Sequence, residues 1–307
     1  MTDQAGLLVI DKPAGVTSHD VVARVRRLAH TRRVGHAGTL DPMATGVLIL
    51  GLNRATKLLT FITGTSKEYQ ATIRLGVSTT TDDAEGEMLS ALGCPHVDGD
   101  EIERHLVALR GPIMQVPAAV SAIKVDGQRA YRRVLQGEEV KLAARPITIH
   151  RFETVGSPRP GVDAAGTPVV DIDVIVECSS GTYIRSLARD LGAALGVGGH
   201  LTALRRTRVG EWSITQATPL ADLEEGALPL EPLGDALVRL YPCLVASAQQ
   251  AAAFGHGQAP RLELGEDPAE GTLFALVDGS SSAAETLGLL QWSDGKLKTA
   301  LVSNPTQ

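Results

Sequence analysis

The sequence predicts an α/β protein of two domains, and three observations point to this fold class. The chain has 307 residues, 43% of them hydrophobic, which supplies at least one large core and a length closer to two domains than to one. Apolar runs typical of strands alternate with helical patterns through residues 6–215. The remainder has short apolar runs between glycine-rich turns, which favours a small β-rich domain.

The first elements are expected around a turn near the N-terminus. Residues 6–11 read as a buried strand, which ends at Lys12-Pro13. Ser18 is the expected N-cap of the helix that follows, with apolar residues at helical spacing on one face. Arginines crowd its other face through residue 33. They form either a solvated helix surface or a patch that contacts phosphates.

Residues 34–46 contain three glycines, so we expect a loop between two core elements. A half-buried strand is expected over residues 67–76, followed by an exposed acidic connection over 79–87. The other expected elements are a strand over 47–52, a short helix over 55–62, a helix over 100–111, strands over 145–156 and 169–180, a helix over 182–196 and a strand near 208–214.

Proline and glycine scattered between residues 218 and 234 predict a linker. We therefore expect a first domain over residues 1–235, with a basic and polar arm at about 117–145, and a β-rich domain over 245–307. The net charge is −6, but residues 216–307 hold twelve acidic and four basic side chains, which leaves the first 215 residues at about +2. Attraction for a polyanion therefore belongs to the first domain.

The cysteines and the N-terminus narrow the class of protein. Cys94, Cys178 and Cys243 lie far apart without a Cys-x-x-Cys pair, which disfavours both a disulfide framework and a zinc site, so no metal is expected. The N-terminus lacks the pattern of a secretion signal, and no apolar run approaches the length of a membrane span. We expect a soluble, cytoplasmic protein with no membrane partner.

Asp41 is the acidic residue of the glycine-rich loop. It precedes Pro42, which restricts it to extended backbone and so fixes the direction of its carboxylate. Gly35, Gly38 and Gly46 allow tight turns or close approach of a ligand. Taken alone, the same pattern is also that of an ordinary turn or capping aspartate.

The string from Gly35 to Leu48, GHAGTLDPMATGVL, closely resembles the signature of the bacterial tRNA pseudouridine-55 synthases, the TruB family. Further matches follow in the family's order over about two thirds of the chain: KPAGVTS at 12–18, KEY at 67–69, SAIK at 121–124 with Gly127 and Tyr131, GTYIR at 181–185, and LRRT at 204–207.

This resemblance implies a pseudouridine-synthase domain, with a mixed and mainly antiparallel sheet flanked by helices, and a small C-terminal PUA-like β-barrel. It also implies that the chain isomerises uridine at position 55 in the T-arm loop of tRNA, without an obligatory protein partner. The reaction breaks a glycosidic bond and makes a carbon-carbon bond to the same sugar. Because it involves no net redox change, no cofactor is expected.

The resemblance assigns catalytic roles to three residues. Asp41 would attack the sugar or abstract a proton from it, and the sequence does not choose between these routes. Arg185 would pair with that carboxylate in a bidentate geometry that keeps it ionised and aimed. Tyr69 would stack on the target base and assist removal of the proton at carbon 5. Without the family, Arg185 is equally a surface arginine, and Tyr69 a half-buried strand tyrosine.

The target uridine lies inside a folded loop, so the enzyme must extrude it. His36 matches the family residue that fills the gap left in the RNA, although a histidine between glycines is more often a solvated loop residue. Phosphate contacts are expected from the basic helix and the Arg205-Arg206 pair, and the arm would close over the RNA. The full set of predicted substrate- and RNA-binding residues is His36, Lys12, Tyr183, Leu204, Arg205, Arg206 and Lys124.

The arm departs from the family pattern. Ala118-Ala119 and Val134-Leu135 stand where the family usually has a second proline and an Ala-Arg pair, so the arm's RNA contacts follow the family less closely. Two alternative functions remain: an RNA-binding or RNA-folding module without turnover, and a pseudouridylase that depends on a guide RNA and protein partners. Retention of Asp41, Tyr69 and Arg185 argues against the first, and the bacterial signatures favour the stand-alone enzyme.

Overall fold

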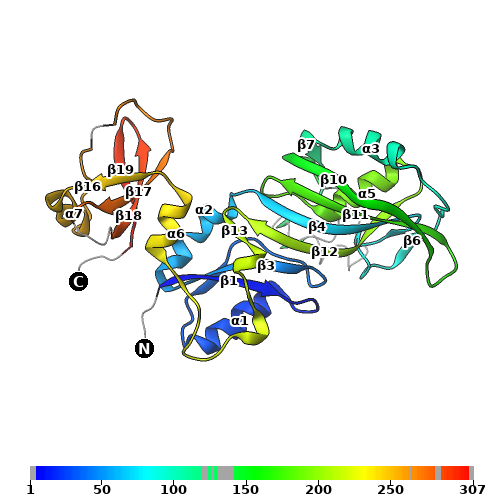
Figure 1. Cartoon of the computed structure of the whole chain (residues 1–307), viewed down its shortest axis with the longest axis horizontal. Helices are drawn as coiled ribbons and strands as arrows, with labels where there is room; N and C mark the ends of the chain where they lie inside the picture. The colour runs from blue at the N-terminus through cyan, green and yellow to red at the C-terminus, as the bar shows by residue number, and fades with distance from the viewer. Residues whose placement is uncertain are drawn as a thin grey trace.

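The computed structural model describes residues 5–118, 142–262, 264–280 and 285–303, together with the backbone of 124–125 and 128–129. These residues form an elongated molecule with a large sheet and, at one end, a small C-terminal sheet (Figure 1). Most of the predicted arm, including the side chain of Lys124, lies outside the described residues. No helix in the described ranges is long and apolar enough to cross a membrane.

The large sheet has eleven strands, eight of them in the order β14-β1-β3-β12-β4-β11-β10-β7. The other three pair with strands of this row: β2 with β3, β13 with β12 and β15 with β1. Only β1 with β14 and β3 with β12 pair in parallel, so the mixed, mainly antiparallel sheet predicted from the family is confirmed. The strands are β1 (Gly6–Lys12), β2 (Val34–His36), β3 (Thr45–Leu52), β4 (Lys67–Leu75), β7 (Gly111–Gln115), β10 (Arg145–Val162), β11 (Pro168–Cys178), β12 (Gly199–Val209), β13 (Trp212–Ser213), β14 (Thr218–Pro219) and β15 (Glu231–Pro232).

Three helices pack against one hydrophobic cluster on this sheet. They are α1 (Ser18–Leu28), α3 (Gly99–Ala108) and α5 (Ile184–Ala194), and their buried residues join those of β4 and β11. The half-buried strand predicted over 67–76 is β4, where alternate side chains from Lys67 to Leu75 are buried. The alternation gives β4 one face against the helices and one face toward solvent.

The short helix expected over residues 55–62 is divided between a 3-10 turn, η1 (Asn53–Lys57), and α2 (Leu59–Thr63). Both lie on the second hydrophobic cluster, which covers the other face of β1 and β3. Val47 and Ile49 of β3 point into this cluster, whereas Leu48 and Leu50 point into the first. The central strands are therefore buried on both faces, as their unbroken apolar sequence predicts.

The segment predicted as a linker is instead part of the large sheet. Thr218 pairs with Ile10 and Glu231 pairs with Leu7, so both ends of the segment lie against β1. Leu220 and Leu223 between them are buried in the first cluster. This segment, with its proline and glycine residues, leads the chain back to β1. A free linker has the same composition, so the local sequence does not distinguish the two.

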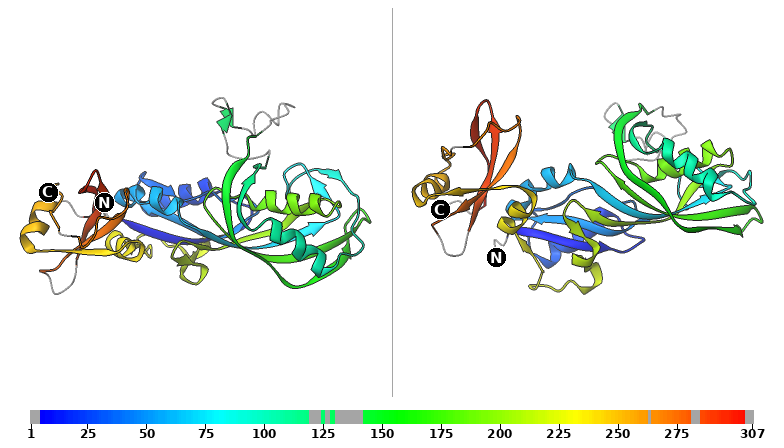
Figure 2. Two further views of the ribbon diagram at one scale, coloured as in Figure 1. Left: turned by 90° about the horizontal axis from the view of Figure 1, so that it is seen from above. Right: turned by 45° about the horizontal axis from the view of Figure 1, so that its top comes forward.

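The C-terminal sheet has the order β16-β17-β18-β19, from β16 (Cys243–Ala246) through β17 (Leu273–Asp278) and β18 (Thr286–Ser293) to β19 (Lys296–Val302), with α7 (Ala248–Gly255) packed on it. Figure 2 shows it at the end of the molecule beside α6 (Leu233–Leu240). Leu233 and Leu237 of α6 share one cluster with Leu7 of β1 and Leu289 of β18. The closed barrel and the domain boundary stay predictions.

Two further details differ from the sequence expectation. Thr17, not Ser18, is the N-cap of α1: its hydroxyl accepts from the amide of Asp20 at 3.1 Å, and the Asp20 carboxylate accepts from the amide of Thr17 at 2.9 Å. Ser18 is buried and its hydroxyl accepts from the amide of Leu40 at 3.0 Å. Residues 34–36 of the expected loop form β2, which pairs with β3.

The expected exposed acidic connection over 79–87 is also folded inward. It leaves β5 (Ser78–Thr79) and returns to β6 (Met88–Ser90), and Asp83 within it is only 3% exposed. Asp82 lies 3.2 Å from the guanidinium of Arg189, and burial raises its pKa to about 6. Acidic composition predicts a solvated loop, but the arginines of α5 supply partners that the local sequence does not show.

We predict that Gly46→Ala destabilises the protein far more than Gly15→Ala. Both glycines have positive φ, 101° and 81°, which costs a side-chain-bearing residue roughly 1 kcal/mol. A Cβ at Gly46 would lie 2.1 Å from the carbonyl oxygen of Arg206, whereas one at Gly15 meets nothing within 4 Å. Chemical unfolding should show that Gly46→Ala lowers the free energy of unfolding by about 2 kcal/mol or more beyond the effect of Gly15→Ala. Equal losses of stability in the two variants would contradict the close packing at Gly46.

We predict that Asp82→Asn becomes increasingly stabilising, relative to the wild type, as the pH rises from 4.5 to 7.5. A carboxyl whose folded pKa is raised contributes stability that is present below its unfolded pKa near 4 and is lost as the pH rises through about 6. The difference in the free energy of unfolding should change by on the order of 2 kcal/mol. Glu87→Gln, at an exposed acid of the same segment, is the control. A pH-independent difference at Asp82 would refute the burial argument.

Candidate functional site

The loop that carries Asp41 connects β2 to β3 and is fastened to the turn after β1. The carbonyl of Pro42 accepts from the amide of Gly15 at 2.9 Å and from the ammonium of Lys12 at 3.2 Å. Lys12 is fully buried, and its ammonium also donates to the carbonyl of Val16 at 2.7 Å. Lys12, one of the predicted substrate- and RNA-binding residues, thus ties the Asp41 loop to β1.

Arg185 holds the carboxylate of Asp41 with two nitrogen atoms. Its Nε lies 3.0 Å from Oδ2 and its Nη2 lies 3.2 Å from Oδ1. The Arg185 side chain is 6% exposed and that of Asp41 35% exposed. The carboxylate is therefore oriented from its protein side and remains accessible from the other.

On the side away from Asp41, Arg185 contacts the acidic segment 79–87, and the sequence analysis did not predict this contact. Nη1 donates to the carbonyl of Thr81 at 2.8 Å and lies 3.6 Å from Oδ2 of Asp83. The buried Asp83 carboxylate also accepts from the hydroxyl of Thr81 and the amide of Glu85. Arg185 thus lies between two carboxylates. The adjacent acidic residues Asp82 and Asp83 were the only hint of this contact in the sequence. Two adjacent acids indicate a solvated loop equally well.

A cavity of about 470 Å³ opens beside Asp41. Tyr69 of β4 and Leu204 of β12 form part of its wall, and both are at least 92% buried. Burial raises the pKa of the Tyr69 phenol, so this side chain is a neutral hydroxyl near neutral pH. Tyr183 also lines the cavity, and its backbone amide and carbonyl are both bonded to the side chain of Gln115.

Lys67 is a second lysine of the site, and the sequence analysis assigned it no role. The residue lines the cavity, and its ammonium donates to the carbonyls of Thr63 and Thr65 at 2.7 and 2.5 Å. Burial lowers the pKa of Lys67 to about 8, and burial likewise lowers that of Lys12 to about 8. Lys67 thus adds a buried cation to the cavity wall, beside Arg185 and Arg206.

His36 lies on β2 and is not among the residues that line the cavity. Its ring contacts that of the exposed His19 edge to face, with 5.8 Å between centroids. Burial and the neighbouring His19 lower the pKa of His36, which keeps the imidazole neutral near pH 7. A neutral, partly exposed ring suits the predicted insertion into an RNA stack, and that role stays a prediction.

Arg205 and Arg206 are predicted to contact phosphates as a pair, but the structure places them in different environments. The Arg206 side chain is buried, with the residue 1% exposed, and it donates to backbone carbonyls. Arg205 points to the opposite face of β12, where it pairs with Asp11 at 2.6 Å and is 38% exposed. The alternation of a strand separates these neighbours, so adjacent arginines do not share an environment.

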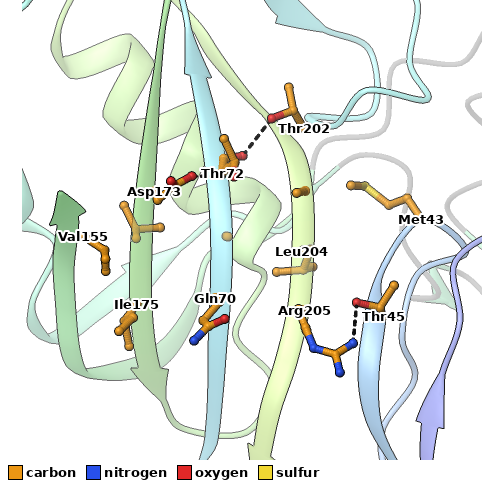
Figure 3. A pocket seen from close by; sticks show the side chains of 13 residues that line it. Met43, Thr45, Gln70, Thr72, Val155, Asp173, Ile175, Thr202, Leu204 and Arg205 are labelled. Atoms are coloured by element: carbon orange, nitrogen blue, oxygen red, sulfur yellow. Dashed lines mark hydrogen bonds between the residues drawn. The ribbon is translucent and has the colours of Figure 1, made fainter. Parts of the chain in front are cut away.

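The opposite face of the sheet has a cavity of its own, of about 550 Å³. Figure 3 shows its lining, with Arg205 turned toward Thr45 and Thr72 toward Asp173. Leu204 contributes to the walls of both cavities. In the described ranges, no three His, Cys, Asp or Glu side chains gather in the manner of a metal site.

Comparison with known sequences places two family models on the chain. Residues 26–184 match the TruB family pseudouridylate synthase N-terminal domain, and residues 185–238 match the tRNA pseudouridylate synthase B C-terminal domain. The tRNA pseudouridine synthase B of Paenarthrobacter aurescens is 55% identical over 98% of this chain and 96% of its own length. That of Mycobacterium leprae is 51% identical over 98% of this chain and 91% of its own length.

Solved structures agree with these sequence matches. The Cbf5-Nop10-Gar1 complex contains a chain with a TM-score of 0.68 and 26% identity, covering 98% of this chain and 84% of that one. The archaeal box H/ACA sRNP Nop10-Cbf5 complex gives a TM-score of 0.65 and 25% identity, covering 98% and 85%. With more than half of the sequence matched by its family model and relatives above 50% identity over nearly its whole length, the chain belongs to the TruB family of pseudouridylate synthases.

Proposed function

We propose that this chain converts uridine to pseudouridine at position 55 in the T-arm loop of tRNA, with Asp41 as the reacting carboxylate. The observation that carries the proposal is the geometry of Asp41, which two nitrogens of Arg185 hold at the edge of a cavity that includes Tyr69. The names of the relatives that match nearly the full chain support tRNA as the substrate.

The chemistry requires that the bond between C1′ and N1 breaks, that the uracil turns, and that a bond forms between C1′ and C5. The base then loses a proton at C5 and gains one at N1, so the product is an isomer of the substrate. Asp41 acts on the sugar, either by attack or by proton abstraction. Both routes require an oriented carboxylate with a free edge, which the Arg185 pair and the partial exposure of Asp41 supply.

Tyr69 and Leu204 then hold the uracil while it is detached. Their buried side chains offer a flat, apolar wall for a base, and the neutral Tyr69 phenol places one polar group against it. The cavity lies within the protein, so a uridine stacked in an RNA loop reaches it only after extrusion. His36, on β2, is proposed to fill the vacated place in the RNA stack.

Activity on bare RNA distinguishes the stand-alone enzyme from the alternatives. Purified protein incubated with unmodified tRNA transcript, with no other RNA or protein, should produce pseudouridine at one position of the T-arm loop. Binding without product would favour an RNA-folding module. Product only after addition of a guide RNA and partner proteins would favour the guide-dependent alternative.

We predict that Asp41→Asn abolishes isomerisation and leaves the Kd for tRNA nearly unchanged, because the carboxylate acts on the sugar and attracts no phosphate. Asp171→Asn is the matched control, since Asp171 is also held by two nitrogens of an arginine, Arg74, at 2.8 and 2.7 Å on the same sheet. Single-turnover assays measure both. A rate for Asp41→Asn within about tenfold of the wild type, roughly 1.4 kcal/mol of barrier, would exclude Asp41 as the essential group.

We predict that Arg185→Lys is severely impaired in turnover while it still binds tRNA. A lysine ammonium cannot reproduce the planar fork that contacts both Asp41 oxygens and, on its other side, the carbonyl of Thr81. Arg74→Lys removes an equivalent fork away from the site and should leave the single-turnover rate within about threefold. Comparable rates for the two variants would show that the Arg185 fork is dispensable.

A further inference from the structure

Arg206 is a buried cation whose side chain connects the Asp41 loop to the sheet. Its Nε donates to the carbonyl of Val47 at 2.7 Å, and its Nη2 donates to the carbonyl of Gly38 at 3.1 Å. Nη1 lies 3.5 Å from the carbonyl of Thr39. Gly38 and Thr39 lie three and two residues before Asp41 in the same loop, so the guanidinium anchors this loop to β12.

The backbone of Arg206 is equally constrained. It pairs with Gly46, where the loop ends, and with Tyr69 on the other neighbouring strand. The approach to Gly46 is so close that a Cβ there would overlap the Arg206 carbonyl. Arg206 therefore lies between the strand that follows Asp41 and the strand that carries Tyr69.

Arg206 also lines the cavity of about 470 Å³ that Asp41, Tyr69 and Leu204 line. One buried residue thus contacts the loop of the reacting carboxylate, the strand that carries Tyr69, and the cavity itself. Because Arg206 is 1% exposed, it is not placed to meet RNA phosphates.

We propose that Arg206 is a positioning residue for pseudouridine formation, which holds the Asp41 loop in place against the strand that carries Tyr69. The inference rests on the proposed function, since it concerns the same site. Replacing Arg206 should therefore slow the isomerisation step and leave the affinity for tRNA unchanged.

The test compares Arg206 with Arg74, whose guanidinium pairs with Asp171 and does not line the cavity. Arg206→Lys and Arg206→Gln are measured beside Arg74→Lys and Arg74→Gln for single-turnover rate at saturating tRNA, for Kd across a salt series, and for thermal unfolding. Folded Arg206 variants should isomerise about 100-fold more slowly, the cost of a displacement of about 1 Å, with Kd and its salt dependence unchanged. The Arg74 variants should stay within about threefold of the wild-type rate.

A second readout separates positioning from general support of the fold. Among the folded variants, Arg206→Lys should keep more of the rate than Arg206→Gln, because an ammonium keeps the buried charge and can still donate to the carbonyls of Val47 and Gly38. Folded Arg206 variants within threefold of the wild-type rate would overturn the proposal, as would unfolding of both variants. Weaker binding with a salt slope reduced by about one would assign Arg206 to a phosphate instead. If the wild type itself forms no pseudouridine, the proposed function fails, which is a separate result.

Discussion

The contact between the Arg185 guanidinium and the Asp41 carboxylate is the interaction on which the site depends. A buried cation is costly unless it is paired and its donors are satisfied. Arg185 meets this requirement with Asp41 in front, Asp83 behind and the Thr81 carbonyl beside it. The acidic segment 79–87, α5 and the loop after β2 must all be in place for this arrangement to form. The large sheet provides that common frame.

The site also contains cations that do not pair with Asp41. Lys12, Lys67 and Arg206 are all buried, and backbone carbonyls satisfy most of their donors. The described side chains show no hydrogen bond or ion pair from these three cations to a carboxylate, so each keeps its charge among backbone carbonyls. The acidic C-terminal segment carries the opposite charge. On charge alone, we expect RNA to approach the large sheet.

Much of the fold could be predicted from the sequence, because the information was local or carried by the family strings. The alternation in residues 67–76 predicts β4, and the resemblance predicts the mixed sheet; both are confirmed. Other features depend on contacts between residues that are distant in the sequence, and local patterns do not predict them. Thr17 caps α1 because Ser18 is used by the Asp41 loop, and the predicted linker over 218–234 returns to β1.

The candidate site shows the same division. The family strings singled out Asp41 and Arg185, and the fold brings these residues together from distant parts of the chain. Asp83 was hidden in a segment whose composition indicates solvent exposure, and Arg206 was paired with Arg205 only because the two are adjacent in sequence. Burial depends on which face of a strand a residue occupies, and a two-residue string does not contain that information.

The most direct test of the account is a crystal structure of the Asp41→Asn variant bound to an unmodified T-arm stem-loop. The account predicts that the target uridine is extruded into the cavity against Tyr69 and Leu204, with its C1′ within about 3.5 Å of the side chain at position 41. A target uridine still stacked in the RNA loop, or bound in the cavity on the opposite face of the sheet, would contradict the assignment of catalysis to this site.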